Sequence, residues 1–334
     1  MSSSASFTEV DVLVVGAGLS GLMAAQVVRE GGWRVRVLDK ARGVGGRMST
    51  RRMGEHAADH GAQYFTAHDP EFRLRVEGWE REGVVRRWCT GFAGPDGELK
   101  DNGVPRYCGV PGMSSVAKHV ARGLEVVLQA KVARVEVEPS GDGGRWRVVT
   151  ETGEGHGGRV LVLTPPVPQG LSLLTAGGVA LPAQVREGLE ATDYAPCLTL
   201  MVRLSGPSRI PEPGGIWMSG EPLLWMADNQ RKGVSRAEGA LVTIHAGQEF
   251  SRERYRDAES EVTAAMLAEA VEWLGSEVVE TQMHRWRYSV PLRVHPGRCL
   301  VVEGPPLLVL AGDAFGGPRV EAAALSGLAA GAVV

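Results

Sequence analysis

The stretch VDVLVVGAGLSGLMAAQVVREGGWRVRVLD, residues 10–39, decides the fold. Its first part, Val10 to Val15, is apolar except at Asp11, which is typical of a parallel strand covered on both faces. A G-x-G-x-x-G pattern follows and opens a helix that we expect to end at residues 31–32. A second apolar strand, residues 33–38, stops at an acidic residue. This order of strand, glycine turn, helix and strand predicts a dinucleotide-binding βαβ unit, with a glycine-rich turn in an ordinary α/β sheet as the alternative.

Each glycine of this turn has a chemical reason. Gly16 permits the tight turn, Gly18 lets the backbone approach a pyrophosphate, and Gly21 lets the helix lie against the strand. The helix N-terminus would offer free N–H groups and a partial positive charge to the phosphates. Asp39, at the end of the second strand, would accept hydrogen bonds from ribose hydroxyls. The turn residues that we expect to contact the cofactor are Gly16, Gly18, Leu19, Ser20 and Gly21.

A second glycine-rich turn, DKARGVGGRM at residues 39–48, follows directly. Its glycines allow close backbone approach, and Arg42 and Arg47 supply donors for phosphate oxygens. A plain nicotinamide dehydrogenase does not need this second contact, whereas a bulkier dinucleotide held in an extended form does. A solvated basic loop is the alternative interpretation. The expected cofactor contacts here are Lys40, Arg42, Gly45, Gly46, Arg47 and Met48.

A third feature lies near the other end of the chain. An apolar strand over Leu307 to Leu310 precedes Gly312 and Asp313, and a helix is predicted to start near Arg319. The plainer alternative is a C-terminal helix that only closes the sheet.

Composition excludes several classes of protein. The chain has 334 residues, of which 43% are hydrophobic and 22% charged, and its net charge is −3, so we expect no general affinity for nucleic acid or anionic membranes. Its four cysteines form no C-x-x-C pair, which argues against a zinc ribbon and a redox disulfide. The apolar residues 12–25 follow acidic residues and contain glycines, so we interpret them as strand and turn instead of a signal peptide. We predict no membrane span and a cytoplasmic location with reduced thiols.

The remaining chain indicates a second domain. Only one dinucleotide fingerprint is present, and residues 140–149 are expected to form a hairpin turn. Residues 159–168 are expected to form a buried strand that leaves through prolines towards the domain edge. His56 and His60 have the spacing of a metal pair on a helix, but their surroundings indicate extended chain, so we predict no metal site. Alternating polar and apolar residues predict a sheet-rich substrate domain, residues 69–108 and 171–298, inserted into a cofactor domain of residues 1–68, 109–170 and 299–334.

Several stretches together carry a family resemblance. Besides the glycine turns they are DHGAQYFTA (59–67), GVPGMSSVAKHVA (109–121), DNQRKG (228–233), HRWRY (284–288) and GDAFGGPRVEAAALSG (312–327). The sequence resembles the renalase branch of the flavin amine oxidase superfamily. The resemblance implies an α/β fold with a Rossmann-type FAD domain like that of p-hydroxybenzoate hydroxylase, and noncovalent FAD. It also implies oxidation of 2- or 6-dihydro isomers of NAD(P), with hydride transfer to flavin N5 and reoxidation by O₂ to hydrogen peroxide.

The resemblance also implies roles for individual residues. Gln63 and Tyr64 would follow the flavin edge, Asn229 and His245 would hydrogen-bond the carboxamide or ribose, and Trp286 would wall the nicotinamide ring. The alternative for both His245 and Trp286 is an ordinary core position. Asp313 would bind the ribityl chain or pyrophosphate, and the helix from Arg319 would start beneath the flavin ring. The cofactor contacts implied outside the glycine turns are Gly61, Ala62, Gln63, Val132, Gly312, Asp313, Arg319 and Val320.

Two alternative functions remain open. Residues 300–334 contain no cysteine to attach a flavin, and no tyrosine or tryptophan for the aromatic cage of an amine oxidase. An amine oxidase or isoprenoid desaturase of the same fold is nevertheless the first alternative. A non-catalytic flavin-binding protein is the second.

Overall fold

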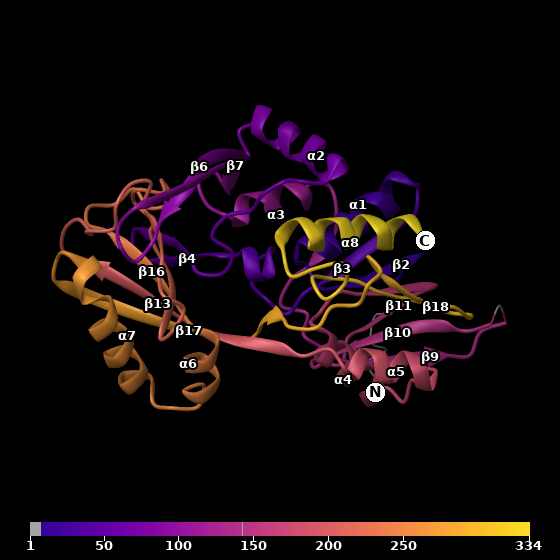
Figure 1. Ribbon diagram of the computed structural model, residues 1–334. Coiled ribbons are helices and arrows are strands. Elements are labelled where there is room, and N and C mark those ends of the chain that lie inside the picture. Colours follow the sequence, from indigo (N-terminus) through magenta and orange to yellow (C-terminus); the bar gives the residue numbers. More distant parts are fainter. Residues whose placement is uncertain (1–7, 142) are drawn as a thin grey trace. The chain divides into compact units, whose positions relative to one another are not determined.

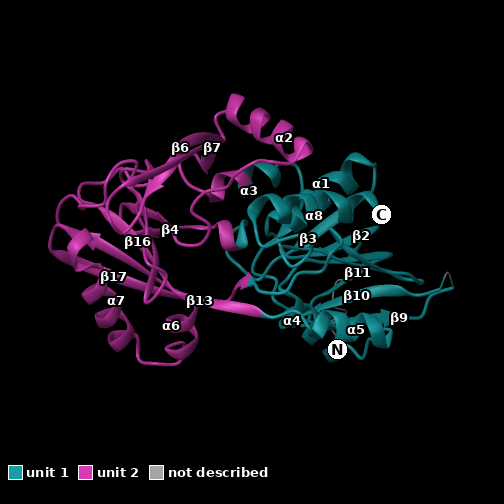
Figure 2. Cartoon of the chain, viewed as in Figure 1, with its two compact units in different colours: residues 1–46, 117–193, 291–334 teal, residues 47–116, 194–290 magenta. Residues whose placement is uncertain are grey.

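The computed structural model describes residues 8–141 and 143–334. The chain divides into two compact units (Figure 2). Unit 1 comprises Met1–Gly46, Ala117–Asp193 and Pro291–Val334, and unit 2 comprises Arg47–Val116 and Tyr194–Val290.

These bounds differ from those expected from the sequence. Residues 47–68 and 109–116 lie in unit 2, and residues 171–193 and 291–298 lie in unit 1. The first difference has a packing reason, because Met53 and Ala58 bury their side chains against Met201 and Leu241 of unit 2. Burial against distant strands therefore places residues 47–59 with the second unit.

The main sheet of unit 1 follows the predicted βαβ pattern (Figure 1). Its six strands, in spatial order, are β18 (Leu300–Val302), β19 (Leu307–Leu310), β12 (Val160–Leu163), β2 (Val12–Val15), β3 (Val35–Leu38) and β8 (Glu125–Val127). All pairs are parallel except β18 with β19. β2 and β3 are buried along their whole length, as the apolar run predicted. β12, which leads into the prolines, lies in the middle of the sheet.

Helices α1 (Leu19–Glu30) and α8 (Val320–Ala332) pack closely against each other, as Figure 1 also shows. A Cβ atom at Gly327 would lie 2.1 Å from the carbonyl oxygen of Ser20, so this glycine sets the approach of the two helices. α1 ends at the predicted glycine pair, where Gly31 is its C-cap. Each of these helices begins after a loop that follows the end of a parallel strand. Ligands bind at such strand ends in parallel sheets.

Unit 1 has a second, four-stranded sheet in the order β1 (Thr8–Glu9), β11 (Gly155–Gly158), β10 (Arg145–Thr150) and β9 (Val132–Glu138). β9 and β10 form the predicted antiparallel hairpin, and residue 142 in its turn lies outside the described residues. Helices α3 (Ser114–Val120), α4 (Val167–Ala176) and α5 (Ala183–Glu190) complete the connections around these sheets.

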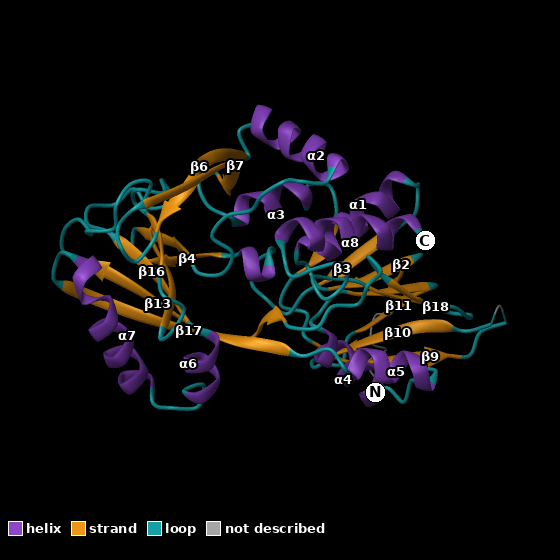
Figure 3. Ribbon diagram, in the orientation of Figure 1, coloured by secondary structure: helices purple, strands orange, loops and turns teal. Residues whose placement is uncertain are grey.

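Unit 2 is built on a seven-stranded sheet, visible with its helices in Figure 3. The strand order is β17 (Val278–Pro291), β13 (Tyr194–Leu204), β16 (Leu241–Ala246), β15 (Leu223–Asp228), β14 (Gly215–Trp217), β6 (Val85–Ala93) and β7 (Leu99–Gly109). β4 (Thr50–Met53) and β5 (His56–Asp59) form a separate two-stranded hairpin in unit 2. The unit is therefore rich in sheet, as predicted.

Besides its strands, unit 2 contains three helices that the sequence pattern did not single out: α2 (Pro70–Arg81), α6 (Gln248–Glu253) and α7 (Glu259–Leu274). Asp69 caps α2 by accepting a hydrogen bond from the backbone N–H of Glu71, and Pro70 occupies the first turn. α7 buries residues four apart, Val262, Met266 and Ala270, against the sheet core. Among the described residues, no helix is both long and apolar enough to cross a membrane.

Candidate functional site

The two glycine turns lie side by side in unit 1. The backbone N–H of Gly45 donates to the carbonyl oxygen of Ala17 at 2.8 Å, and Gly18 and Gly45 form an isolated parallel bridge. The Asp39 carboxylate joins the turns, because Oδ2 accepts from the N–H of Ala17 at 2.6 Å and Oδ1 from that of Ala41 at 2.7 Å. Each oxygen retains a second lone pair for a ribose hydroxyl. Asp39 therefore holds the two glycine turns together through its own carboxylate.

The start of α1 has the properties of a phosphate site. Its N-cap, Gly18, makes no side-chain cap, and a Cβ atom there would meet no atom within 4 Å. The Ser20 hydroxyl is buried and has no hydrogen-bond partner in the part of the chain that the structure describes. Gly16 has φ +108°, and a Cβ atom there would lie 2.5 Å from Thr164 Oγ1, so only glycine suits this position. An uncapped helix start, open space and an unpartnered hydroxyl fit a dinucleotide pyrophosphate.

The other expected cofactor residues of unit 1 lie in the loops after β3 and β19 or at the starts of β9 and α8. Ala130, two residues before Val132, donates its N–H to the carbonyl oxygen of Asp39 at 2.9 Å. Gly312 has φ +137° and donates its N–H to Ser326 Oγ of α8 at 2.8 Å. Arg319 is the N-cap of α8 and makes no side-chain cap there. Lys40 and Arg42 are exposed, and Asp313 and Val320 are half-buried.

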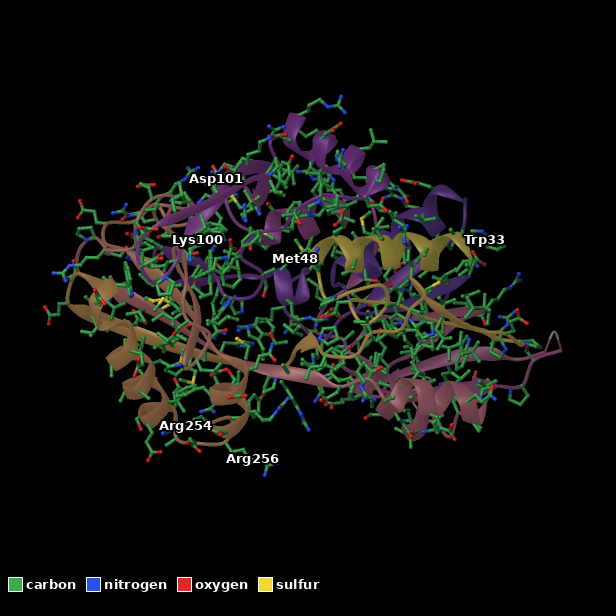
Figure 4. The ribbon with its side chains drawn as sticks, viewed as in Figure 1. Trp33, Met48, Lys100, Asp101, Arg254 and Arg256 are labelled. Carbon is green, nitrogen blue, oxygen red and sulfur yellow. The ribbon has the colours of Figure 1, made fainter. Side chains whose placement is uncertain are left out.

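Five expected cofactor residues belong to unit 2. The Arg47 carbonyl oxygen accepts from the N–H of Ala62 at 2.8 Å, and a Cβ atom at Gly61 would lie 2.0 Å from that oxygen. Arg47 Nη1 also donates to two carbonyl oxygens of β17, at 3.2 Å each. Met48, labelled in Figure 4, is buried. Gln63 is buried as well, and its Nε2 donates to the carbonyl oxygens of residues 59 and 61 at 2.6 and 3.1 Å.

A buried ion pair lies at the centre of this part of unit 2. Lys232 Nζ is 2.8 Å from Asp59 Oδ2, and both side chains have an exposed fraction of 0%. Asp59 closes β5, and Lys232 follows β15 in the DNQRKG stretch. Sequence reasoning did not single out either residue as a site residue, although both lie in stretches that carried the family resemblance.

A cluster of rings surrounds the carbonyl oxygen of His60. Trp286 Nε1 donates to this oxygen at 3.0 Å, and His245 Nε2 lies 3.3 Å from it. His60 stacks on Trp286 with ring centroids 5.1 Å apart, and His284 contacts both rings at 5.1 and 4.1 Å. The cluster is formed by β16, β17 and the segment after β5. His60 and His284 were not among the expected catalytic residues.

The surroundings keep these histidines uncharged. Burial is the largest reason that the pKa of His60 is lowered to about 3; charge repulsion, from His284 when it is protonated and from Arg51, adds to it. Burial also lowers the pKa of His245 to about 4, and burial and then Arg51 lower the pKa of His284. Because a carbonyl oxygen can only accept, a hydrogen bond from His245 to it requires the proton on Nε2 and leaves Nδ1 as an acceptor.

The other expected catalytic residues occupy different surroundings. Asn229 has an exposed fraction of 0%; its Oδ1 accepts from the N–H of Asp59 at 3.0 Å, and its Nδ2 donates to Leu241 O and Thr243 Oγ1 at 2.9 Å each. It is thus bonded inside the protein and holds the last residue of β5. Tyr64 is half-buried in an aromatic group with Trp88, Phe92 and Trp225.

The two histidines that were considered as metal ligands, His56 and His60, have different surroundings. His56 is in extended chain, as expected, and its Nδ1 is 3.2 Å from Ser235 Oγ. Across the described ranges, no group of three or more metal-binding side chains is close enough to hold an ion.

Comparison with known families identifies the class. The profile described as "Flavin containing amine oxidoreductase" matches residues 79–334, and that of an NAD(P)-binding Rossmann-like domain matches residues 14–76. The chain therefore belongs to the flavin containing amine oxidoreductase family. More particularly, it is similar to mouse (Mus musculus) renalase, with 27% identity over 330 residues that cover 91% of this chain and 92% of renalase. It is a renalase-like flavin oxidoreductase.

Solved structures with a similar fold include enzymes named as oxidases. A putrescine oxidase variant has a TM-score of 0.73 and 15% identity, covering 98% of this chain and 99% of its own. Cyclohexylamine oxidase from Brevibacterium oxydans has a TM-score of 0.72 and 12% identity, covering 97% and 98%. A putative protoporphyrinogen oxidase from Exiguobacterium sp. has a TM-score of 0.72 and 13% identity, covering 100% and 99%. At these identities the similarity establishes the fold only.

Proposed function

We propose that the protein is an oxidase of misreduced dihydronicotinamides, the 2- or 6-dihydro isomers of NAD(P), with noncovalently held FAD. One observation carries the proposal: the stretches with the renalase-like pattern converge on residues 59–63. DNQRKG supplies Lys232 and Asn229, β16 supplies His245, and HRWRY supplies Trp286. The similarity to mouse renalase over nearly the whole chain supports the same activity.

Bound FAD would supply the redox chemistry, a two-electron oxidation of the dihydronicotinamide with O₂ as the final acceptor, giving NAD(P)⁺ and hydrogen peroxide. The chain's own residues bind and orient it. The start of α1 and the unpartnered Ser20 hydroxyl would bind the pyrophosphate, and Asp39 would accept from a ribose hydroxyl. Noncovalent binding agrees with the lack of cysteine in residues 300–334.

The uncharged histidines suit this substrate. A dihydronicotinamide becomes an aromatic cation when its hydride leaves, so the site needs no strong base and is better without positive charge. The low pKa values of His60 and His245 keep both rings neutral at pH 7. His245 Nδ1 would then accept from the carboxamide N–H, and the Trp286 ring would orient the nicotinamide.

The amine oxidase alternative has less support. Phe315 is the only aromatic residue in residues 300–334, and it is buried against His295 with ring centroids 5.4 Å apart. A buried ring offers no free face to an amine cation.

Anaerobic stopped-flow absorbance of the bound flavin tests the proposal. We expect rapid bleaching by the 2- or 6-dihydro isomer and little by ordinary 4-dihydro NADH. Equal or faster bleaching by ordinary NADH or by a simple amine would contradict it. A flavin that stays oxidised with every reductant would instead indicate a non-catalytic flavin-binding protein.

A further inference from the structure

The buried pair of Asp59 and Lys232 needs an explanation beyond stability. Both side chains are fully buried, and their charged atoms are 2.8 Å apart. Removing two charges from water costs about as much as their attraction returns, so a buried ion pair adds little over apolar residues of the same size. The pair is therefore better explained by the positions that it fixes than by the stability that it adds, because its hydrogen bonds are directional.

Every polar atom of Asp59 has a partner. Its backbone N–H donates to Asn229, and its carbonyl oxygen accepts from Gln63 and from Thr243 at 2.6 and 2.9 Å. Its Oδ1 accepts from the hydroxyl of Thr50 at 2.6 Å and from the N–H of residue 113 at 2.9 Å. The pair thereby ties β4, β5, β16 and the segments after β7 and β15 to one point.

Lys232 completes this arrangement from the other side. Its Nζ lies 3.5 Å from Gln63 Oε1 and 5.0 Å from the centre of the Trp88 ring, besides its bond to Asp59. Lys232 therefore holds both ends of the segment from residue 59 to residue 63. Its side chain is fully buried, so it has no surface to offer a substrate.

The carbonyl group held next to this pair is the one that orients the rings. His60 directly follows Asp59, and its carbonyl oxygen accepts from Trp286 and His245. A shift of Asp59 would move this acceptor and turn both rings away from their present directions. Displacements of about 1 Å in a positioning group can lower a rate about a hundredfold.

We propose that Asp59 and Lys232 are positioning residues, which set the directions of His245 and Trp286 through the carbonyl group of His60. The inference rests on the proposed function, since it names how that site is held in place. Neither residue touches the substrate in this arrangement.

The test compares Asp59→Asn, Lys232→Met and the double variant, each with flavin bound. Each single change leaves one buried charge unpaired, so both are expected to lower the thermal midpoint. The double change removes both charges, and its thermal midpoint should return close to that of the wild type. Flavin reduction by the preferred dihydronicotinamide at saturation should nevertheless stay about tenfold or more below the wild-type rate. Recovery of both stability and rate in the double variant would overturn the proposal.

A second readout does not depend on activity. The indole N–H resonance of Trp286, assigned by its loss in Trp286→Phe, reports the hydrogen bond to His60. We expect faster hydrogen exchange of this indole in the double variant than in the wild type, and an unchanged exchange rate would overturn the proposal. If no dihydronicotinamide reduces the wild-type flavin, the proposed function fails, and indole exchange alone decides whether the pair positions the ring.

The matched control is the exposed ion pair of Arg203 and Glu280 in the same unit, whose atoms are 3.2 Å apart. Replacing it by Arg203→Met and Glu280→Gln should change neither the rate nor indole exchange, since exposed pairs contribute little. A loss as large as that of the Asp59 and Lys232 variant would show a general effect of charge removal and overturn the assignment.

Discussion

Replacing His60 by Phe should make the protein less sensitive to acid. The imidazole is 5% exposed, its Nδ1 has no hydrogen-bond partner in the described part of the chain, and burial lowers its pKa from 6.5 to about 3. The unfolded chain takes up a proton as pH falls below 6.5, whereas the folded chain does not until about pH 3. The folded state is therefore fully favoured above pH 6.5 and loses stability progressively as pH falls towards 3.

The size of the effect follows from this window. Each pH unit below 6.5 lowers the free energy of unfolding by about 1.4 kcal/mol for one such histidine, so His60 accounts for about 2 kcal/mol between pH 7 and pH 5. His245, with its pKa of about 4, adds a similar loss that the variant retains. Phe keeps the ring contact with Trp286 and removes the titration, so the wild type should lose about 2 kcal/mol more than His60→Phe over this range.

Urea unfolding at pH 7 and pH 5, with flavin in excess, measures this difference. The comparison uses the change between the two pH values, so that any constant cost of the substitution cancels. His68→Phe, which replaces an exposed imidazole, is the control. If wild type and His60→Phe lose the same free energy between the two pH values, the reasoning on the buried imidazole is refuted.

Three further substitutions test other parts of the site. Gly61→Ala places a Cβ atom 2.0 Å from the Arg47 carbonyl oxygen, and should lower the free energy of unfolding by about 1–3 kcal/mol. Gly43→Ala, where a Cβ atom meets open space, should not lower it, and equal thermal midpoints of the two variants would contradict this. Asp39→Ala should weaken FAD binding by about 1–3 kcal/mol in a flavin titration, and unchanged affinity would count against the assignment. His245→Ala should slow flavin reduction in stopped-flow without loss of FAD; unfolding instead would make it a core histidine.

The cofactor half of the fold was predictable because its signals are local. The strand, glycine turn, helix and second strand all lie within residues 10–39, and each signal is set by neighbours in sequence. The predicted hairpin, formed by β9 and β10, and the start of α8 next to Arg319 are likewise local features. The second role of Asp39, in joining the two glycine turns, required the positions of backbone N–H groups that no sequence pattern gives.

The centre of unit 2 was less accessible from the sequence. Asp59 and Lys232 are 173 positions apart, so only the folded sheet brings them together. His60 was considered only as a metal ligand, because its contact with Trp286 spans more than two hundred residues. Asn229 was predicted to bind substrate, but its amide is bonded within the protein; burial of that kind depends on tertiary packing and not on spacing.

The most direct test of the flavoenzyme assignment is the cofactor itself. The purified protein, reconstituted with flavin and gel-filtered, is precipitated with acid, and the supernatant and pellet are analysed by chromatography and absorbance. We predict FAD in the supernatant, one molecule for each chain, and a colourless pellet. A protein that retains no flavin, or flavin that remains attached to the pellet, would contradict noncovalent FAD on the two glycine turns.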